Sequence, residues 1–538
     1  MNLAYDRRAP FYCLLSLGYT SGRLNLADGK NILLIVVDQW RGEAVPALGH
    51  PCLRTPNLDS LCADGVTFRN HFTQGAPCGP GRASLLTGQY VMNHRVVSNG
   101  VPMDARHTNI SHVIRDMGYQ PALVGYTTTT PDPRETSAND PQFKVLGTNM
   151  QGFRVVSSFE PNKIPYFNWL RAKGYQVPER PLDIWLPEDN DALPGATTSA
   201  ARIPKELSDS TWSTESALEY LQGPETDPWF LHLGYYRPHP PFIVPAPYNT
   251  YHDPADVPAP TRAATPEQEA AQHPLLGHYM RAIKQRKFFE NGEGLSSEMS
   301  EDEVRVMRAA YYGMMSEVDA NIGRVIDHLK ETGQYENTLI ILTSDHGEQL
   351  GDHYLLGKVG YFDESFHIPL VICDPSKDAD ATRGTIVDAF TGSIDVMPTI
   401  LDWMGAKTPR TCDGTSLTPF LRGVTPADWR TEIQFEFDFR TYFADAHNSV
   451  LGLDIDQCSL AVIRDENYKY VHFDALPPLF FDLEKDPGQF NNLAEDPAYA
   501  GRVLEYAQKM LNWRLHYAER TLTGYSSSPN GLLDRLHG

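Results

Sequence analysis

Two apolar segments, each of which runs straight into acidic and polar residues, constrain the fold of this chain most strongly. Residues 31–39 have the sequence Asn-Ile-Leu-Leu-Ile-Val-Val-Asp-Gln, and residues 338–346 have the sequence Thr-Leu-Ile-Ile-Leu-Thr-Ser-Asp-His. An apolar run without alternation is typical of a strand that is buried on both faces of a parallel sheet. Because ligands bind at the carboxyl ends of such strands, we expect a functional site where the two polar endings meet.

Strand-like and helical patterns alternate over residues 31–419. Residues 122–125 and 229–235 are further short apolar runs, and an apolar periodicity typical of a long helix extends over residues 303–332. This alternation predicts an α/β domain with a large, mainly parallel sheet that is flanked by helices.

The pattern changes in the last quarter of the chain. Residues 420–538 are expected to form a smaller C-terminal α+β domain with an antiparallel sheet, closed by a helix over about 499–517. Two stretches rich in proline and alanine, residues 184–198 and 253–275, are expected to be surface loops. The short β-like runs of the C-terminal part are residues 433–439, 460–463, 468–473 and 479–481.

Composition excludes several classes of protein. The 538 residues carry a formal net charge of −22, which argues against a nucleic-acid-binding protein. An anionic substrate would therefore need local positive charge, from a metal ion or from placed cationic side chains. The seven cysteines are scattered and odd in number, which does not indicate a disulfide framework. No segment reaches the ~18 apolar residues of a membrane span.

Residues 1–30 loosely imitate a signal peptide. Arg7 and Arg8 precede a short apolar run at residues 11–17, but no clear cleavage site of small residues follows. We therefore expect an atypical or disordered leader, and a cytoplasmic protein rather than an exported one.

The strongest chemical signal is a cysteine at the start of a predicted helix. Residues 78–88 have the sequence Cys-Gly-Pro-Gly-Arg-Ala-Ser-Leu-Leu-Thr-Gly. Pro80 is typical of a first helical turn, which places Cys78 at the helix N-terminus, where a thiolate or a bound anion is stabilised. Arg82, one turn later, can add a fixed positive charge.

This motif resembles the signature that the formylglycine-generating enzyme recognises in type I sulfatases. The resemblance implies that Cys78 is oxidised to formylglycine, whose hydrate is a geminal diol. One hydroxyl would attack phosphorus or sulfur, and the other would then collapse the covalent intermediate. Sulfatases commonly have serine at the position of Gly81, which is a mild departure.

The polar endings of the first two segments supply the expected metal ligands. Asp38, Gln39, Asp345 and His346, together with the diol at Cys78, would form one site for a divalent cation, which lowers the pKa of the diol. Sulfatases typically have Asp-Asp and Asp-Asn at these two places. The replacement of one carboxylate by an amide, and the arrival of an imidazole, favour manganese or zinc over calcium.

The same substitutions, with several longer stretches, resemble the phosphonate monoester hydrolases of the alkaline phosphatase superfamily. The resemblance implies that Asn99, Tyr126 and Thr128 hold the non-bridging oxygens of the substrate. It implies that His239 and Lys358 serve the leaving oxygen, and that Arg82 supports the nucleophile. His232, His353 and His367 are interpreted as structural. The stretches that carry the resemblance are residues 125–134, 234–242, 344–353 and 468–473.

The expected function is hydrolysis of phosphonate monoesters and phosphodiesters, with promiscuous sulfatase and phosphatase activity. An arylsulfatase that cleaves sulfate monoesters is the alternative, because both kinds of substrate are singly charged and tetrahedral. A non-catalytic binding protein would require that Cys78 remain a thiol. The resemblance further implies a homotetramer in which C-terminal segments cross between subunits.

Overall fold

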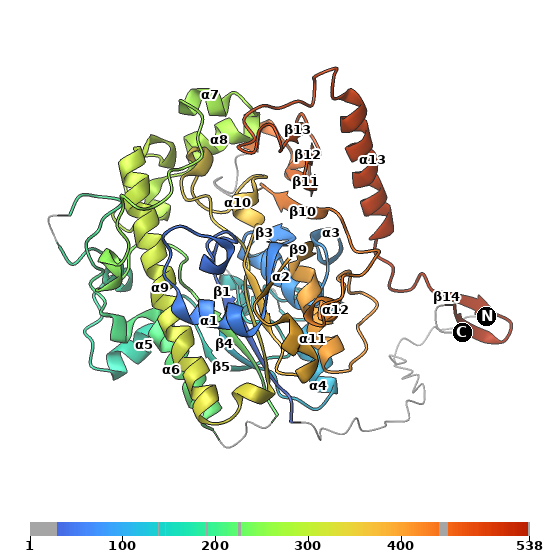
Figure 1. The fold of residues 1–538 in the computed structure, drawn as a ribbon, viewed down its shortest axis with the longest axis horizontal. Helices are drawn as coiled ribbons and strands as arrows, with labels where there is room; N and C mark the ends of the chain where they lie inside the picture. Colours follow the sequence, from blue (N-terminus) through green and yellow to red (C-terminus); the bar gives the residue numbers. More distant parts are fainter. Residues whose placement is uncertain are drawn as a thin grey trace, which may run out of the picture.

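The computed structural model describes residues 29–535 except 138, 146, 190–191, 224–227 and 441–449. An eight-stranded sheet forms its centre, in the order β5-β4-β6-β1-β7-β8-β2-β9 (Figure 1). Its strands are β1 Asn31–Val37, β2 Val66–Phe72, β4 Ala122–Gly125, β5 Arg154–Ser158, β6 Phe230–Tyr235, β7 Thr338–Ser344, β8 Leu370–Cys373 and β9 Thr385–Gly392.

Neighbouring strands of this sheet are parallel, except that β8 is antiparallel to both β7 and β2. The predicted mainly parallel α/β fold is confirmed. The helices are α1 Pro56–Asp64, α2 Cys78–Thr87, α3 Val91–His94, α4 Ile110–Asp116, α5 Ile164–Ala172, α6 Asp209–Leu221, α7 Pro266–Ala270, α8 Pro274–Ala282, α9 Glu301–Glu331, α10 Asp363–Phe366, α11 Val396–Trp403, α12 Thr418–Leu421 and α13 Ala500–His516.

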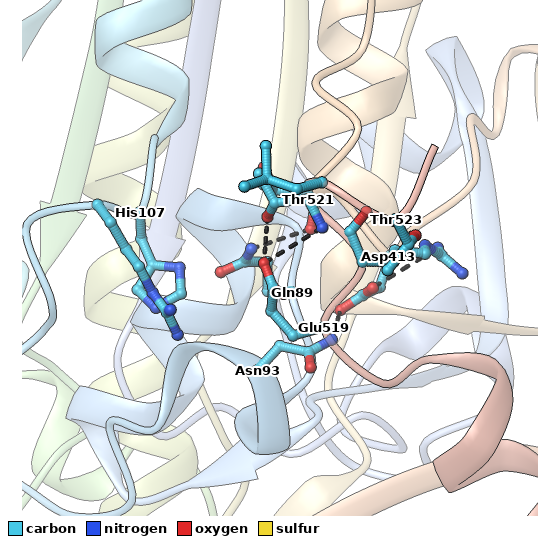
Figure 2. Close-up of a pocket in the computed structure, with 11 residues that line it drawn as sticks. Gln89, Asn93, His107, Asp413, Glu519, Thr521 and Thr523 are labelled. Carbon is cyan, nitrogen blue, oxygen red and sulfur yellow. Dashed lines mark hydrogen bonds and ion pairs between the residues drawn. The ribbon is translucent and has the colours of Figure 1, made fainter. Parts of the chain in front are cut away.

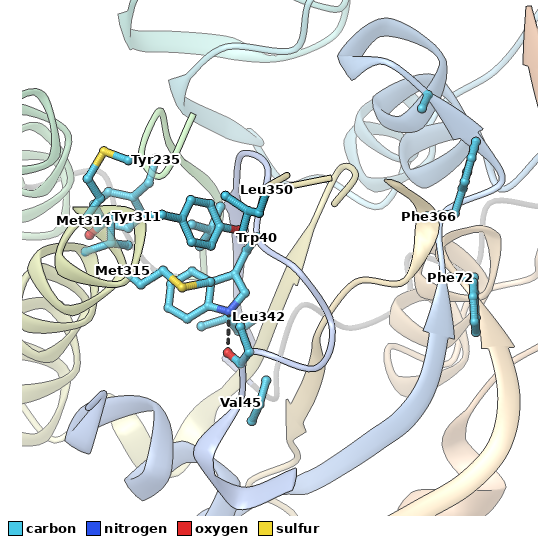
Figure 3. Close-up of a cluster of buried hydrophobic side chains, with 14 of the residues drawn as sticks. Trp40, Val45, Phe72, Tyr235, Tyr311, Met314, Met315, Leu342, Leu350 and Phe366 are labelled. Atoms are coloured by element: carbon cyan, nitrogen blue, oxygen red, sulfur yellow. Dashed lines mark hydrogen bonds between the residues drawn. The ribbon is translucent and has the colours of Figure 1, made fainter. Parts of the chain in front are cut away.

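Strand β1 explains the unbroken apolar run, because both of its faces are covered. Leu33, Ile35 and their odd-numbered neighbours pack in a cluster with α9 and α6, whereas Leu34 and the even-numbered residues pack with α2, α4 and α11. Just beyond β1, Trp40 is fully buried beside Met315 of α9, and its indole N–H donates to the backbone oxygen of Ala44 at 2.8 Å (Figure 3). The site-bearing end of β1 is therefore held in a dry core.

The C-terminal part contains the predicted second sheet, in the order β13-β12-β11-β10-β3. Four of its strands are antiparallel neighbours, and the fifth, β3, comes from the segment just before Cys78 and pairs in parallel with β10. The predicted boundary at residue 420 stays a prediction. The strands are β3 Gly75–Ala76, β10 Ile433–Asp438, β11 Ser459–Arg464, β12 Tyr468–Phe473 and β13 Leu479–Asp482.

Other predicted segments differ from the structure or lie outside it. Residues 253–275, expected to be a loop, contain α7 and the start of α8, each of which begins with a proline in its first turn. Of the predicted leader, only residues 29 and 30 lie within the described residues. After α13 the chain forms a hairpin of β14 Tyr525–Ser528 and β15 Gly531–Asp534, which projects from the body of the molecule (Figure 1). Within the described residues, no helix is long and apolar enough to cross a membrane.

Candidate active site

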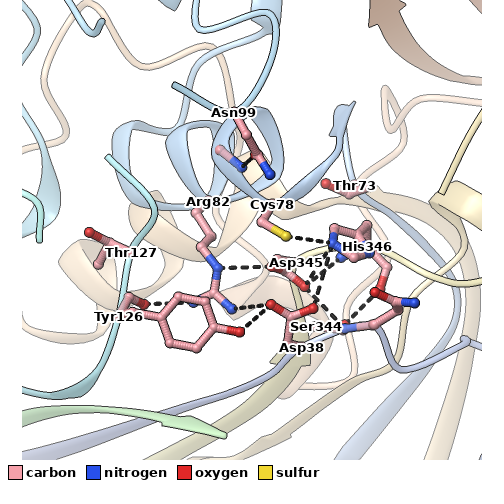
Figure 4. Close-up of polar contacts among 12 residues, drawn as sticks. Asp38, Thr73, Cys78, Arg82, Asn99, Tyr126, Thr127, Ser344, Asp345 and His346 are labelled. Carbon is pink, nitrogen blue, oxygen red and sulfur yellow. Dashed lines mark hydrogen bonds and ion pairs between the residues drawn. The ribbon is translucent and has the colours of Figure 1, made fainter. Parts of the chain in front are cut away.

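The carboxyl ends of β1 and β7 lie side by side and bring the two polar endings together. In their parallel register Val37 lies opposite Ser344, so that Asp38 and Asp345 emerge at the same level of the sheet. The amino end of α2 meets this edge and presents Cys78 to it (Figure 4). The expectation that the two endings meet is confirmed.

Asp38, Cys78, Asp345 and His346 form one buried cluster. Each side chain offers a possible ligand atom, and these four atoms all lie within 4.8 Å of one another. The His346 Nε2 atom is 3.2 Å from the Cys78 sulfur and 3.7 Å from an Oδ1 atom of each aspartate. Two carboxylates and an imidazole are a donor set that suits a divalent transition metal.

Arg82 holds the two aspartates in place. Its Nε atom donates to Asp345 Oδ2 at 2.8 Å, and its Nη2 atom donates to Asp38 Oδ2 at 3.1 Å. Its Nη1 atom donates to the backbone oxygen of Tyr126 at 2.7 Å, and the whole guanidinium is buried. Because Arg82 occupies the Oδ2 atom of each aspartate, both Oδ1 atoms are left to face His346.

Two details of the cluster fit a bound cation. Asp38 Oδ1 is buried and has no hydrogen-bond partner among the described residues, which is costly for a carboxylate oxygen unless a cation compensates it. His346 Nδ1 lies 3.0 Å from the backbone oxygen of Gly347, which places the proton on Nδ1 and directs the Nε2 lone pair into the cluster. Burial lowers the pKa of His346, so its imidazole is neutral, as a metal ligand must be.

The surroundings of Cys78 do not favour a thiolate. Burial, followed by the nearby carboxylate of Asp38, raises the pKa of the Cys78 thiol, although Lys358 and Arg82 oppose this effect. A protonated thiol is a poor nucleophile. Cysteine itself is therefore poorly suited to attack an ester here, and stabilisation of a thiolate or a bound anion by the helix N-terminus stays a prediction.

Gln39 joins the cluster to Lys358, the residue predicted to serve the leaving oxygen. Its side-chain oxygen accepts a hydrogen bond from Lys358, its side-chain nitrogen donates to Glu348, and its backbone N–H donates to Asp345 Oδ1 at 3.2 Å. Glu348 also accepts the backbone N–H of Gly357, beside Lys358. The role of Gln39 as a metal ligand stays a prediction, and Glu348 is a site residue that the sequence analysis missed.

Two of the three residues predicted to hold substrate oxygens, Asn99 and Tyr126, contact α2 or the aspartates beside it. Asn99 Oδ1 accepts a backbone N–H from the first turn of α2 at 2.7 Å. Tyr126 donates its hydroxyl to Asp38, and its ring centre lies 4.2 Å from the Arg82 guanidinium carbon. Thr128 follows β4 and is buried, with a φ of 51°. Tyr126 thus supports the aspartate cluster, and direct contact of these three residues with substrate stays a prediction.

His239 lies beyond the end of β6 against the ring of Tyr236. The two ring centres are 4.6 Å apart, and His239 Nδ1 is 2.9 Å from the backbone oxygen of Pro240. Burial, and then the positive charge of Lys358, lower the pKa of His239, whereas Asp38 opposes this effect. His239 and Lys358 both help to lower the pKa of Asp38, against the opposing effect of burial. The predicted leaving-group pair therefore lies close to the cluster.

The three histidines interpreted as structural lie outside the four-residue cluster. The His353 ring stacks on Phe362 with ring centres 3.6 Å apart. His367 Nε2 is 2.6 Å from the backbone oxygen of Arg69. His232 is fully buried in β6, and neither of its ring nitrogens has a hydrogen-bond partner among the described residues.

Two further side chains beside the cluster were missed by the sequence analysis. Tyr236 lies 6.0 Å from Tyr126, ring centre to ring centre, and Lys163 places its Nζ atom 3.8 Å from the centre of the Tyr236 ring. Tyr236 lies within residues 234–242, which carry the resemblance to the phosphonate monoester hydrolases. An aromatic residue in such a stretch is as typical of a hydrophobic core as of a functional site. Lys163 belongs to no motif, and only the fold brings it here.

A separate cavity of about 550 Å³ lies between the start of α3 and the segment that follows α13 (Figure 2). Asn93, His107, Asp413 and Glu519 are among the residues that line it. None of the predicted site residues does, so this cavity is distinct from the cluster at Cys78.

Comparisons with known proteins agree with the geometry of the site. The family described as "Sulfatase" matches residues 30–406, and "N-sulphoglucosamine sulphohydrolase, C-terminal" matches residues 351–516. The "Multifunctional alkaline phosphatase superfamily protein PehA" of Trinickia caryophylli is 59% identical over 513 residues, which cover 94% of this chain and 99% of that protein. Crystal structures of phosphonate monoester hydrolases provide two more relatives. The enzyme of Agrobacterium radiobacter is 42% identical with a TM-score of 0.89, and that of Silicibacter pomeroyi is 38% identical with a TM-score of 0.86. Each alignment covers 94% of this chain and 99% of the other.

The fold and the site thus define a hydrolase that acts on ester bonds, and the chain belongs to the sulfatase family. Within the alkaline phosphatase superfamily, it is similar over nearly its full length to phosphonate monoester hydrolases at 38–42% identity. The sulfatase family implies in general a divalent metal and a formylglycine, and the buried cluster of this chain has suitable residues for both.

The departure at Gly81 has a local cause that can be tested. A Cβ atom added to Gly81 would lie 2.3 Å from the backbone oxygen of Asp345, so serine must push α2 away from the cluster. We expect Gly81→Ser to lower the free energy of unfolding by about 1–3 kcal/mol and to reduce the metal bound per chain. Denaturant unfolding and elemental analysis measure the two effects. Gly501→Ser in α13, where an added Cβ would meet nothing within 4 Å, is the matched control. Unchanged stability and metal content would show that the contact relaxes freely.

Proposed function

We propose that this protein hydrolyses phosphonate monoesters and phosphodiesters with a formylglycine made from Cys78. The observation that carries the proposal is the position of Cys78, whose sulfur lies 3.2 Å from His346 Nε2 within the buried aspartate cluster. The full-length similarity to two solved phosphonate monoester hydrolases supports this substrate class over the arylsulfatase alternative.

The proposed reaction has two covalent steps. One hydroxyl of the hydrated aldehyde attacks phosphorus, and the bond from phosphorus to the leaving oxygen breaks. The second hydroxyl then loses its proton, the carbon–oxygen bond to phosphorus breaks, and water rehydrates the aldehyde. A divalent cation held by Asp38, Asp345 and His346 would lower the pKa of the attacking hydroxyl and polarise the substrate.

The remaining side chains have roles that follow from their places. Charge develops on the leaving oxygen in the transition state, and Lys358 with His239 would neutralise it. Asn99 fixes the amino end of α2, and Arg82 and Tyr126 fix the aspartates. Thr128 would help to hold the non-bridging oxygens of the substrate. Because Arg82 is already shared by two carboxylates, the site suits a singly charged ester better than a dianion.

Substrate preference tests this function directly. We expect kcat/KM for the 4-nitrophenyl ester of phenylphosphonate to exceed that for 4-nitrophenyl sulfate by about tenfold or more, because the leaving group is shared and only the transferred group differs. Steady-state kinetics on protein produced together with a formylglycine-generating enzyme measures the ratio. Cys78→Ala is the control and should lose about 10³-fold of the activity.

Two results would reject the proposal. A higher kcat/KM for the sulfate would favour the arylsulfatase alternative. An unmodified Cys78 peptide mass in fully active protein would exclude formylglycine.

We further propose that the bound cation is manganese or zinc rather than calcium. The neutral imidazole of His346 directs a nitrogen lone pair toward the Oδ1 atoms of Asp38 and Asp345, and nitrogen ligands suit these metals better than they suit calcium.

Replacing the imidazole by an amide should reverse this preference. We expect His346→Asn to weaken binding of manganese relative to calcium by about tenfold or more, because it restores an oxygen donor. Competition titrations on metal-stripped protein measure the ratio, with His472→Asn on the exposed side of β12 as the control. Equal ratios in the wild type and in His346→Asn would argue against His346 as a ligand.

We propose that the protein is a homotetramer whose contacts involve the outer face of α13 and the C-terminal hairpin. Tyr506, Met510 and Trp513 turn inward from α13 to the second sheet. Its outer face exposes a stripe of leucines, and the hairpin exposes two more, which is unusual for a surface that faces water. These residues are Leu504, Leu511 and Leu515 on α13 and Leu532 and Leu533 on the hairpin.

The cytoplasmic location expected from the sequence stays a prediction.

The leucine stripe offers a test of assembly. We expect Leu511→Glu with Leu515→Glu to lower the mass in solution from about four times the 60.3 kDa chain, because carboxylates cannot be buried unpaired in an apolar contact. Light scattering after size-exclusion chromatography measures it. Gln222→Glu, which adds a carboxylate at an exposed position after α6 and outside the leucine stripe, is the control. A tetramer that survives the double substitution would rule out this face.

A further inference from the structure

Lys163 is a cation beside the active site that the proposed reaction does not use. It is the residue just before α5, with a φ of 58°, and its backbone N–H donates to the backbone oxygen of Phe159 at 2.6 Å. This backbone turn directs the side chain to Tyr236, where the Nζ atom lies 3.8 Å from the ring centre. An ammonium group over an aromatic face is stabilised, but its charge is not neutralised.

The carboxylates around Lys163 are committed elsewhere. Asp209 is held by Arg237, whose Nε atom is 3.1 Å from Asp209 Oδ2. Asp38 is held by Arg82 and by the hydroxyl of Tyr126.

Glu160, the third carboxylate near this lysine, forms no ion pair with it, and no other described residue does so. Burial lowers the pKa of Lys163, with Asp209 and Glu160 opposing this effect. Lys163 is only partly buried, so that a ligand can reach it.

The position of Lys163 relative to His239 indicates which part of a substrate it would contact. Tyr236 contacts both Lys163 and His239: its ring centre is 3.8 Å from the Lys163 Nζ atom and 4.6 Å from the centre of the His239 ring. His239 is the group assigned to the leaving oxygen. Lys163 therefore lies within about one aromatic ring of the group assigned to the leaving oxygen.

We propose that Lys163 and Tyr236 form a subsite for a leaving alcohol or phenol that carries its own negative charge, such as a carboxylate or a phosphate. The Tyr236 ring packs on the body of the leaving group, and the Lys163 ammonium pairs with its anion. This inference rests on the proposed function, because it uses the assignment of His239 to the leaving oxygen. It names Lys163 as a specificity-determining residue for that reaction.

Two esters of phenylphosphonate that share a nitrophenol leaving group test the subsite. One leaving group is 4-nitrophenol and the other is 4-nitrophenol with a carboxylate next to the nitro group. We expect the ratio of kcat/KM, charged to neutral ester, to fall about fivefold in Lys163→Met, which keeps an apolar stem over Tyr236 but loses the charge. Lys163→Arg should keep most of the ratio. The ratio of the wild type should also fall as salt is added.

The matched control is Lys173→Met at the other end of α5. Lys173 is exposed and pairs with Glu215 at 2.9 Å, so the ratio should not change. An equal ratio in the wild type and Lys163→Met would overturn the subsite, whereas the proposed function would stand.

Binding of the two free nitrophenols, measured by calorimetry on the full chain, decides the question even if neither ester is hydrolysed. Weaker binding of only the carboxylated phenol by Lys163→Met supports the subsite, and equal loss for both phenols, or no loss, contradicts it.

Discussion

The paired hydrogen bonds of Arg82 to Asp38 and Asp345 are the interaction on which the rest of the site depends. Two carboxylates this close would repel each other in a dry interior, and one guanidinium compensates only one of their two charges. Because the arginine takes one oxygen from each aspartate, the remaining charge is concentrated on the two oxygens that face His346. The cluster therefore has an excess negative charge that a bound cation would neutralise, in a chain whose overall charge is also strongly negative.

Two of the three departures from the common sulfatase pattern, at Gly81 and Gln39, are consistent with this arrangement. Glycine at position 81 allows α2 to approach the backbone of Asp345, which sets the distance from Cys78 to the cluster. Glutamine at position 39 donates to Glu348 and accepts from Lys358 at the same time. A carboxylate there could accept from the lysine, but it could not donate to the glutamate and would repel it. The amide therefore links the aspartate cluster to Lys358 without adding charge.

The sequence predicted well those features that depend on short segments. The unbroken apolar runs predicted β1 and β7, and the proline after Cys78 predicted α2, because burial on both faces and helix-start chemistry act over a few residues. Contacts between distant segments left no such pattern. Nothing in residues 154–163 indicates that a lysine there reaches Tyr236, and the glutamate at 348 has the composition of an ordinary polar loop. The prolines of residues 253–275 suggested a loop, although proline is equally suited to a first helical turn.

The pairing of β3 with β10 has a consequence for the order in which the protein is made. Ala76 pairs opposite Phe437, so the strand that anchors the Cys78 segment leaves the ribosome roughly 360 residues after the cysteine does. At usual rates of synthesis this interval is about 20–70 s. In the finished molecule Cys78 is only 5% exposed. Any enzyme that acts on its thiol therefore has its best opportunity during translation, before the C-terminal sheet closes over the nascent site.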